Sequence, residues 1–474
     1  MSSELIGETA CNLVARLRRG DVSPNDLLDA LEKRIGEVDG VVNALPTLCF
    51  DRARARADAM LRRARDERGL LAGLPVPIKD LSNVAGVRTT QGSPIFADVV
   101  PEKSDIVVET IEAQGGLVYA KSNTPEFGAG ASTFNEVFGA TKNPHDLTRS
   151  VAGSSGGAAA ALASGMAWLA HGSDMGGSLR NPASFCGVVG LRPSVGRCAN
   201  GNKAKLDQTL SVQGPMARTV EDVALFLDAM SGADFRAPLS LPRETPSFLD
   251  QARSGSKPKR VAYSADLGIT PVDPEVAAVT RAAALRLEGE GVIVEEAHPD
   301  LAEAHECFQT LRALNMATSL GGLLKSHRDL LKPEIIWNIE KGFALSIADI
   351  VKAEHQRVAM FQRALAFFET YDLLLAPATI TAAFPVGERY LAECAGHRFE
   401  TYIDWLAIVY AVTLVFSPAL SLPCGFTKLG LPVGLQIVAA PRGEGRILAA
   451  AKLVEDMLGL DTAKPIDPRM PKAA

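Results

Sequence analysis

The sequence lacks any cluster of basic residues, and aromatic residues make up only 6% of its 474 positions. A nucleic-acid-binding surface needs positive charge gathered in a patch, often with aromatic side chains that stack on bases. Here 49 basic residues are outnumbered by 55 acidic ones, and the formal net charge is −6. We therefore expect no nucleic-acid partner.

Cysteine is also scarce, and the seven cysteines are scattered without a C-x-x-C pair. Such pairs are typical of structural zinc sites, and an even, regular set of cysteines is typical of disulfide-rich secreted domains. Residues 1–21 mix acidic side chains with arginine and contain no apolar segment suited to a signal peptide. The sequence predicts reduced thiols, no metal site and a cytoplasmic location.

Two stretches, 150–173 and 405–427, contain no Lys, Arg, Asp or Glu. The first is rich in Gly, Ser and Ala, and in the second Pro418 and Pro423 interrupt any continuous helix. A membrane-spanning helix needs about 20 consecutive apolar residues. We therefore expect no membrane span here and predict that both stretches are buried in the centre of the fold.

The apolar periodicity predicts alternating helices and strands. Ser23 and Pro24 are typical of a helix start and predict a helix to about residue 38. Further helices are predicted over 53–68, 107–114, 158–165, 220–230 and 446–458. Strands are predicted over 117–120, 168–170, 188–191, 260–263, 373–377 and 420–423. This alternation favours an α/β fold with a large central mixed sheet and helices on both faces.

Two turns rich in glycine and serine, 153–157 (GSSGG) and 172–178 (GSDMGGS), flank a helix of small residues. Such turns let several backbone N–H groups converge on an anion, either a phosphate or the oxyanion of an acyl-transfer intermediate. A serine in the second turn is therefore a candidate nucleophile. The first turn fits the G-x-S-x-G nucleophile pattern, but it follows the polar stretch 143–149, where we expect no strand.

A nucleophilic serine needs a base, and none of the seven histidines stands in a suggestive context. The other candidate is Lys79, at the end of the proline-bounded apolar run 74–80. Burial lowers the pKa of a lysine, so a buried Lys79 would be neutral and able to accept a proton. Considered alone, Lys79 could equally be a strand-end lysine that reaches solvent.

These segments resemble the motifs of the amidase signature family. Residues 153–157 and 173–180 (SDMGGSLR) match its two central blocks, and 74–80 (LPVPIKD) matches its lysine strand. Matches continue from end to end of the chain, at 190–197 (GLRPSVGR), 214–220 (GPMARTV), 422–425 (LPCG) and 430–436 (GLPVGLQ). The resemblance implies the amidase signature fold.

The resemblance also implies one amidase signature domain over 1–474. Within it we expect N-terminal helices over 1–70, a signature core with the catalytic residues over 71–232, a variable helix-rich pocket region over 233–370 and the C-terminal part of the core over 371–474. The polar, proline-rich stretch 232–259 is predicted to lie at the surface.

Transferred by position, the resemblance makes Ser178 the acylated nucleophile and Lys79 the base. Ser154, which follows a cis peptide bond in the family, relays the proton between them. The oxyanion hole is implied to consist of the N–H groups of Met175, Gly176 and Gly177. The implied supports of the two turns are Ser155, Asp174 and Arg180. The expected reaction is hydrolysis of a carboxylic amide through an acyl-enzyme, with no metal or organic cofactor.

The substrate is less well determined. Four aromatic residues, Trp337, Phe343, Tyr402 and Trp405, belong to the core or line the pocket, and in the second case they favour an apolar acyl group, aryl or aliphatic. Hydrazides and esters stay open as substrates. The expected partner is a small-molecule amide, and the resemblance implies a homodimer.

Two other functions stay open. The glutamine-hydrolysing A subunit of a tRNA-dependent amidotransferase shares this fold, but it usually carries a GMDEFAM-like stretch where this chain reads NTPEFGAG, at 123–130. A non-catalytic binding protein on the same fold is the second alternative. The presence of Lys79, Ser154 and Ser178 argues against it.

Overall fold

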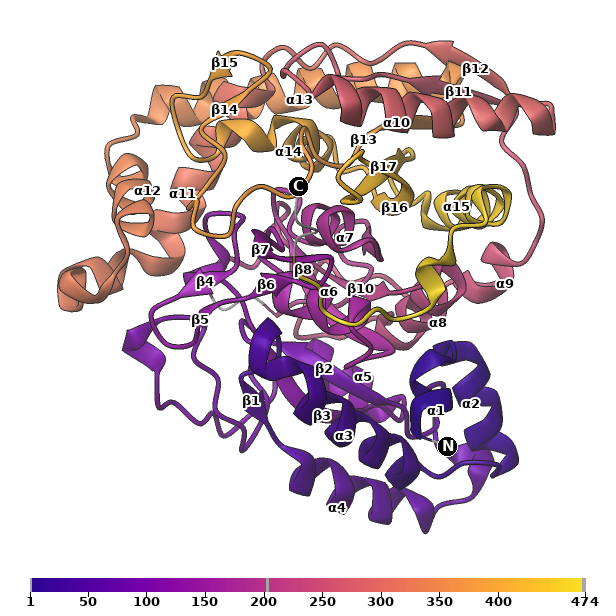
Figure 1. Ribbon diagram of the computed structural model, residues 1–474. Coiled ribbons are helices and arrows are strands. Elements are labelled where there is room, and N and C mark those ends of the chain that lie inside the picture. Colours follow the sequence, from indigo (N-terminus) through magenta and orange to yellow (C-terminus); the bar gives the residue numbers. More distant parts are fainter. Residues whose placement is uncertain (1, 202–203, 471–474) are drawn as a thin grey trace.

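The computed structural model describes residues 2–201 and 204–470, and its centre is an eight-stranded sheet (Figure 1). In spatial order its strands are β12 (Ile293–Glu296), β11 (Arg260–Tyr263), β13 (Leu373–Pro377), β17 (Pro432–Val438), β16 (Ala419–Phe426), β9 (Val189–Arg192), β10 (Val212–Ala217) and β8 (Leu169–Asp174). β12, β11 and β13 are parallel, and the neighbours from β13 to β8 are antiparallel. The predicted mixed central sheet is confirmed.

A second sheet of three strands contains the predicted lysine run. β2 (Pro75–Lys79) is parallel to β3 (Leu117–Ser122), and β1 (Thr47–Leu48) is antiparallel to β3 on its other side. All residues of β2 are buried. The backbone N–H of Lys79 donates to Nδ1 of His171 on β8 at 3.3 Å, so the end of β2 meets the edge of the central sheet.

Helices flank the central sheet. α6 (Gly156–Ala163) and α8 (Val220–Met230) pack on β8 and β10. α7 (Arg180–Cys186), α10 (Pro274–Leu285) and α15 (Glu444–Leu458) pack on β16 and β17. Of the N-terminal helices, α3 (Pro24–Val42) and α4 (Phe50–Leu61) lie beside the three-stranded sheet (Figure 1). α1 (Ser2–Gly7) packs on α3, and α2 (Ala10–Arg19) packs on α8. The other helices are α5 (Ile106–Ala113), α9 (Phe248–Ala252), α11 (Ala304–Ser326), α12 (Pro333–Phe343), α13 (Ile347–Thr370) and α14 (Ala407–Leu414).

Short two-stranded ribbons occupy the loops. They are formed by β4 (Phe134–Asn135) with β5 (Gly139–Ala140), β6 (Lys142–Asn143) with β7 (Asp146–Ser150), and β14 (Glu393–Cys394) with β15 (His397–Arg398). β7 corrects the expectation that no strand precedes the first glycine-rich turn. Because β7 pairs with β6 outside the central sheet, it does not build the strand–turn–helix that the G-x-S-x-G pattern requires.

The two charge-free stretches are buried in the centre, as predicted. The first forms α6 and most of β8, and the second forms α14 and β16. Every residue of α6 and α14 is buried. In the described part of the chain, no helix is long and apolar enough to span a bilayer.

Two expected segments differ in the structure. The helix predicted over 53–68 spans Phe50–Leu61, because its buried side chains end at Met60 and residues 61–67 are exposed, so no apolar face continues the helix. The stretch 232–259 is not wholly at the surface. Its Phe248 is buried beneath the guanidinium of Arg197, which lies 5.1 Å from the ring centroid.

Gly157, in the first turn of α6, allows this helix to touch the backbone of two neighbouring segments. A Cβ at Gly157 would lie 2.4 Å from the backbone N of Asn123 and 2.6 Å from the carbonyl oxygen of Ala44. We expect Gly157→Ala to lower the free energy of unfolding by about 1–3 kcal/mol, measured by urea denaturation.

The matched control is Gly36→Ala in α3, where a Cβ would meet nothing within 4 Å. Since alanine is the better helix former, this variant should be more stable by up to about 1 kcal/mol. Equal effects of the two substitutions would contradict the packing argument.

Candidate active site

The side chain of Lys79 is fully buried and reaches both glycine-rich turns. Its Nζ lies 2.7 Å from Ser154 Oγ, 2.9 Å from Ser155 Oγ and 3.0 Å from Ser173 Oγ. All its partners among the described residues are neutral oxygen atoms. Burial therefore lowers the pKa of Lys79 to about 7, and the negative charge of Asp174 opposes this shift only partly.

A second buried lysine, Lys121 on the neighbouring strand β3, shows the opposite arrangement. Its Nζ lies 3.1 Å from Asp80 Oδ1 and also donates to the carbonyl oxygen of Ser82 at 2.8 Å. Asp80 follows Lys79 directly in the chain, but its carboxylate faces Lys121 and Thr90. Among the described residues, Lys121 therefore has a carboxylate partner, whereas Lys79 has none.

His171 is the histidine nearest to this centre, and both its ring nitrogens are occupied. Nδ1 accepts from the backbone N–H of Lys79, so Nε2 carries the proton and donates to Gln213 Oε1 at 2.9 Å. Burial lowers the pKa of His171 to about 3. This neutral, hydrogen-bonded ring positions Lys79 and is not available as a base.

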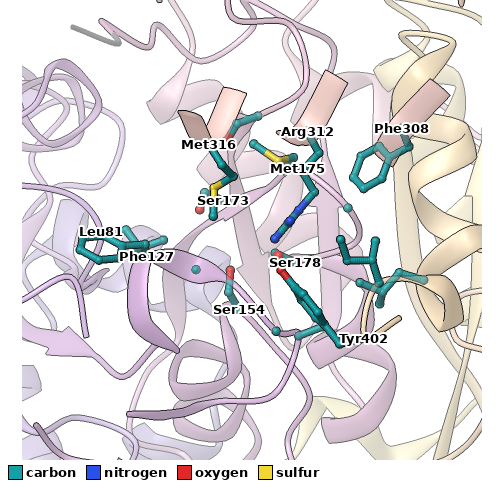
Figure 2. A pocket seen from close by; sticks show the side chains of 17 residues that line it. Leu81, Phe127, Ser154, Ser173, Met175, Ser178, Phe308, Arg312, Met316 and Tyr402 are labelled. Carbon is teal, nitrogen blue, oxygen red and sulfur yellow. The ribbon is translucent and has the colours of Figure 1, made fainter. Parts of the chain in front are cut away.

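Ser154 and Ser178 line the same pocket (Figure 2). The Gly153–Ser154 peptide bond is cis, as the resemblance implied. The two turns are joined where the N–H of Ser155 donates to the carbonyl oxygen of Ser178 at 3.2 Å. The structure brings Lys79 and Ser154 into direct contact. Within the described residues, the Ser178 hydroxyl makes no hydrogen bond to Ser154, and Ser178 faces the pocket.

The carboxylate of Asp174 organises the second turn from inside. It accepts from the N–H groups of Gly177 at 2.9 Å and Leu179 at 3.1 Å. Arg180 donates to it through Nε and Nη2, and Arg192 Nη1 lies 3.3 Å from Oδ1. Burial acts to raise the pKa of Asp174, but the two guanidinium charges outweigh it and hold the pKa well below its usual range.

Because Asp174 binds the N–H of Gly177, this predicted oxyanion donor is already engaged. The N–H groups of Met175 and Gly176 have no acceptor among residues 2–201 and 204–470. Arg180 in turn fixes the turn to the far side of the core, since Nη1 donates to the carbonyl oxygen of Val409 at 2.9 Å and to Gln436 Oε1 at 2.6 Å. The predicted supports therefore do contact the turn that carries Ser178.

The pocket beside Ser178 has a cavity volume of about 100 Å³, whereas one water molecule needs roughly 10–15 Å³. Most of its walls are apolar, formed by residues such as Leu81, Phe127, Phe308, Met316 and Leu406. Its size and lining suit part of a small organic substrate. No group of three or more potential metal-ligating side chains occurs within the part of the chain that the structure describes.

Of the four aromatic residues considered for the pocket, Tyr402 lines it. Trp405 is buried in the core against Phe384, with the ring centroids 5.8 Å apart. Trp337 and Phe343 are exposed, at 36% and 61% of their surface. These last two residues are therefore neither core nor pocket wall.

Sequence reasoning missed Arg312, which lines the pocket between Phe308 and Met316. These three residues follow one another at intervals of four, so they share a face of α11. A charged residue in the middle of an apolar helical stripe is the signal that could have revealed it. For His171, the signal was its position immediately before the second glycine-rich turn, inside a charge-free stretch.

Comparison with known proteins identifies the class to which this fold and site belong. A family model described as Amidase matches residues 26–448. An acylamidase of Rhodococcus erythropolis is 35% identical over 466 residues, which cover 97% of each chain. The crystal structure of a bacterial aryl acylamidase of the amidase signature family superposes with a TM-score of 0.90 at 26% identity, covering 96% of this chain and 97% of the other.

The chain belongs to the amidase signature family, and the predicted fold is confirmed. This membership supports hydrolysis of an amide C–N bond as its activity. A glutamyl-tRNA(Gln) amidotransferase subunit of Moorella thermoacetica is also similar, at 36% identity over 95% of this chain and 97% of the relative.

The low pKa of Lys79 predicts a pH-dependent stability that needs no activity to measure. Between about pH 7, the folded value, and 10.5, the ordinary value, the unfolded chain binds a proton that the folded chain lacks, so stability rises with pH. Relative to Lys79→Met, the wild-type free energy of unfolding should rise by about 1.4 kcal/mol per pH unit in this window. Urea denaturation of both proteins at several pH values measures the slope. A constant difference would show that Lys79 is charged in the folded protein.

Proposed function

We propose that this protein hydrolyses a small carboxylic amide through an acyl-enzyme on Ser178. Ser154 relays protons and neutral Lys79 is the base. The observation that carries the proposal is the 2.7 Å contact of Lys79 Nζ with Ser154 Oγ, in a site where no carboxylate of the described residues pairs with this amine. A neutral amine beside a serine hydroxyl can take a proton from it near neutral pH.

In the first step, Ser178 Oγ attacks the amide carbon while its proton passes to Ser154, whose own proton passes to Lys79. The tetrahedral intermediate then expels the amine, which receives the proton back along the same path. Water hydrolyses the resulting Ser178 ester by the same sequence of transfers. Substrate binding would bring the Ser178 hydroxyl to Ser154, since catalytic hydrogen bonds commonly tighten only in the complex.

The negative oxygen of the intermediate would be bound by the free N–H groups of Met175 and Gly176. Gly177, which the resemblance made a third oxyanion donor, has another role in this proposal. Its N–H donates to Asp174 and fixes the shape of the turn. Ser155 and Ser173 hold the amine of Lys79 in place through their hydroxyls. Arg180 acts as a support through its pair with Asp174.

A glutamine-hydrolysing subunit of an amidotransferase is the second candidate, favoured by the similarity to the Moorella thermoacetica protein. The sequence of residues 123–130 disfavours it. On the resemblance alone, we also propose one catalytic unit over 1–474, a homodimer and a cytoplasmic location.

The first test is hydrolysis of a panel of aliphatic, aryl and arylacetic amides, their hydrazides and esters, and glutamine. We expect turnover of one amide class by the wild-type protein and a loss of about 10³-fold or more in Ser178→Ala, because the acyl-enzyme cannot form. Ser326→Ala, an exposed serine at the end of α11, should keep full activity.

Each other outcome of this panel has a definite meaning. Turnover of glutamine alone would replace the proposal by the amidotransferase function. A folded protein that turns over nothing in the panel would favour the non-catalytic binding protein. Ser178→Ala with undiminished turnover would remove Ser178 from the mechanism.

The second test is the pH profile of kcat/KM for the best substrate. Because burial lowers the pKa of Lys79 to about 7, the base is protonated and inactive below this pH. We expect kcat/KM to fall about tenfold per pH unit on the acid side and to be level above about pH 8. A flat profile from about pH 5 to about pH 9, with chemistry limiting the rate, would exclude lysine as the base.

A further inference from the structure

Arg312 is a buried cation in a pocket that is otherwise largely apolar. It is only 8% exposed, and its side chain extends from α11 into the pocket that Ser178 lines (Figure 2). Burying a guanidinium group is unfavourable unless hydrogen bonds and an opposite charge compensate. The partners of Arg312 therefore show whether the protein itself provides these hydrogen bonds and the opposite charge.

The observed partners of Arg312 are neutral. It donates through Nη1 to Asn338 Oδ1, and its guanidinium carbon lies 5.5 Å from the centroid of the Tyr402 ring. Asn338 also donates to the Tyr402 hydroxyl, so the three side chains form one connected group. This group fixes the direction of the guanidinium, while no carboxylate of the described residues lies within ion-pair distance of it.

The charged groups around Arg312 do not neutralise it either. Burial lowers the pKa of Lys332 to about 8 and also lowers the pKa of Lys341, and the positive charge of Arg312 adds a smaller contribution to both shifts. Nearby carboxylates oppose the two shifts, Glu334 and Glu126 that of Lys332 and Asp404 that of Lys341. The nearby carboxylates are engaged elsewhere. Glu334 pairs with Arg389 at 2.7 Å, and Glu126 accepts from the hydroxyl of Ser93 and the N–H of Lys332. Among the described residues, these carboxylates therefore bind other groups, and none of them forms an ion pair with Arg312.

We propose that Arg312 binds a carboxylate of the substrate, remote from the scissile amide, and thereby selects amides that bear a negative charge. This inference rests on the proposed function and names its substrate class. A guanidinium presents its donors in a planar fork that matches a carboxylate, and the neutral partners leave part of that fork to the pocket. The apolar walls would hold the carbon skeleton between the carboxylate and the amide. This assignment replaces the apolar acyl group that the aromatic residues suggested.

The test compares matched amides with and without a carboxylate. On the acyl side the pair is glutaric acid mono-4-nitroanilide and pentanoic acid 4-nitroanilide. On the amine side it is the pentanoic amides of 4-aminobenzoate and of 4-methylaniline. For one pair we expect the carboxylate member to have kcat/KM about 10- to 100-fold higher, the usual strength of hydrogen bonds to a charged group. The pair that shows the preference tells which side of the amide faces Arg312.

The variants assign this preference to Arg312. Arg312→Met should abolish the preference, measured as the ratio of kcat/KM between the two members of a pair, whatever the change in the rate of the neutral member. Arg312→Lys should restore only part of this ratio because the fork is lost. Arg328→Met is the matched control, since Arg328 is an exposed arginine paired with Glu340 outside the pocket lining. It removes the same charge and should keep the preference. Thermal melting confirms that each variant is folded.

A binding measurement separates failure of this inference from failure of the proposed function. In Ser178→Ala, calorimetric titration with each pair should show the same carboxylate preference, lost in Ser178→Ala/Arg312→Met. If the wild-type protein hydrolyses neither member of either pair, such binding would support the role of Arg312 and contradict the proposed function. Equal binding of the two members in both pairs, or a preference that persists without Arg312, would overturn the inference.

Discussion

A lysine amine enclosed by neutral oxygen atoms is the constraint on which the centre of this protein depends. Burial disfavours the charged form of Lys79, and only a counter-charge at contact distance could restore it. The surroundings of Lys79 are accordingly serines, and the adjacent Asp80 turns to Lys121. The one carboxylate that acts on Lys79 from nearby in the described chain, Asp174, is itself paired with Arg180 and Arg192. The negative charge of Asp174 is thus paired with arginines, and no carboxylate of the described residues forms an ion pair with the Lys79 amine.

The same centre accounts for the unusual composition of the two charge-free stretches. In the first stretch, a Cβ at Gly172 would come within 2.8 Å of Ser155 Oγ, and one at Gly157 within 2.4 Å of the backbone N of Asn123. The backbones around the site approach too closely for larger side chains, and the segments that cover them are buried on all sides. Buried positions with such close backbone contacts accept only small or apolar residues. The absence of charged residues over a long stretch therefore indicates the position of the site in the sequence more clearly than any single residue does.

The chemistry and the choice of substrate come from different parts of the chain. The groups proposed for proton transfer lie on β2 and on the two turns around α6, all before residue 180. The opposite wall of the pocket comes from α11 and from residues 402–406, which are remote in sequence. Because α11 presents Phe308, Arg312 and Met316 on one face, changes on this helix can alter the pocket without disturbing Lys79 or the serines.

The sequence by itself determined the family, the alternation of helices and strands, the burial of the charge-free stretches and the candidate residues Lys79, Ser154 and Ser178, because these depend on local pattern and motif. It could not end α4 at Leu61, place Phe248 in the core or show that the Gly177 N–H is taken by Asp174, since each depends on contacts between distant segments. Arg312 is the clearest case. In the sequence it is a charged residue within an apolar helical stripe, but only the packing of α11 against α12 and Tyr402 makes it a buried charge facing the pocket. Spacing along the chain predicts which residues share a face, whereas the tertiary structure alone decides what that face meets and whether its charge is neutralised.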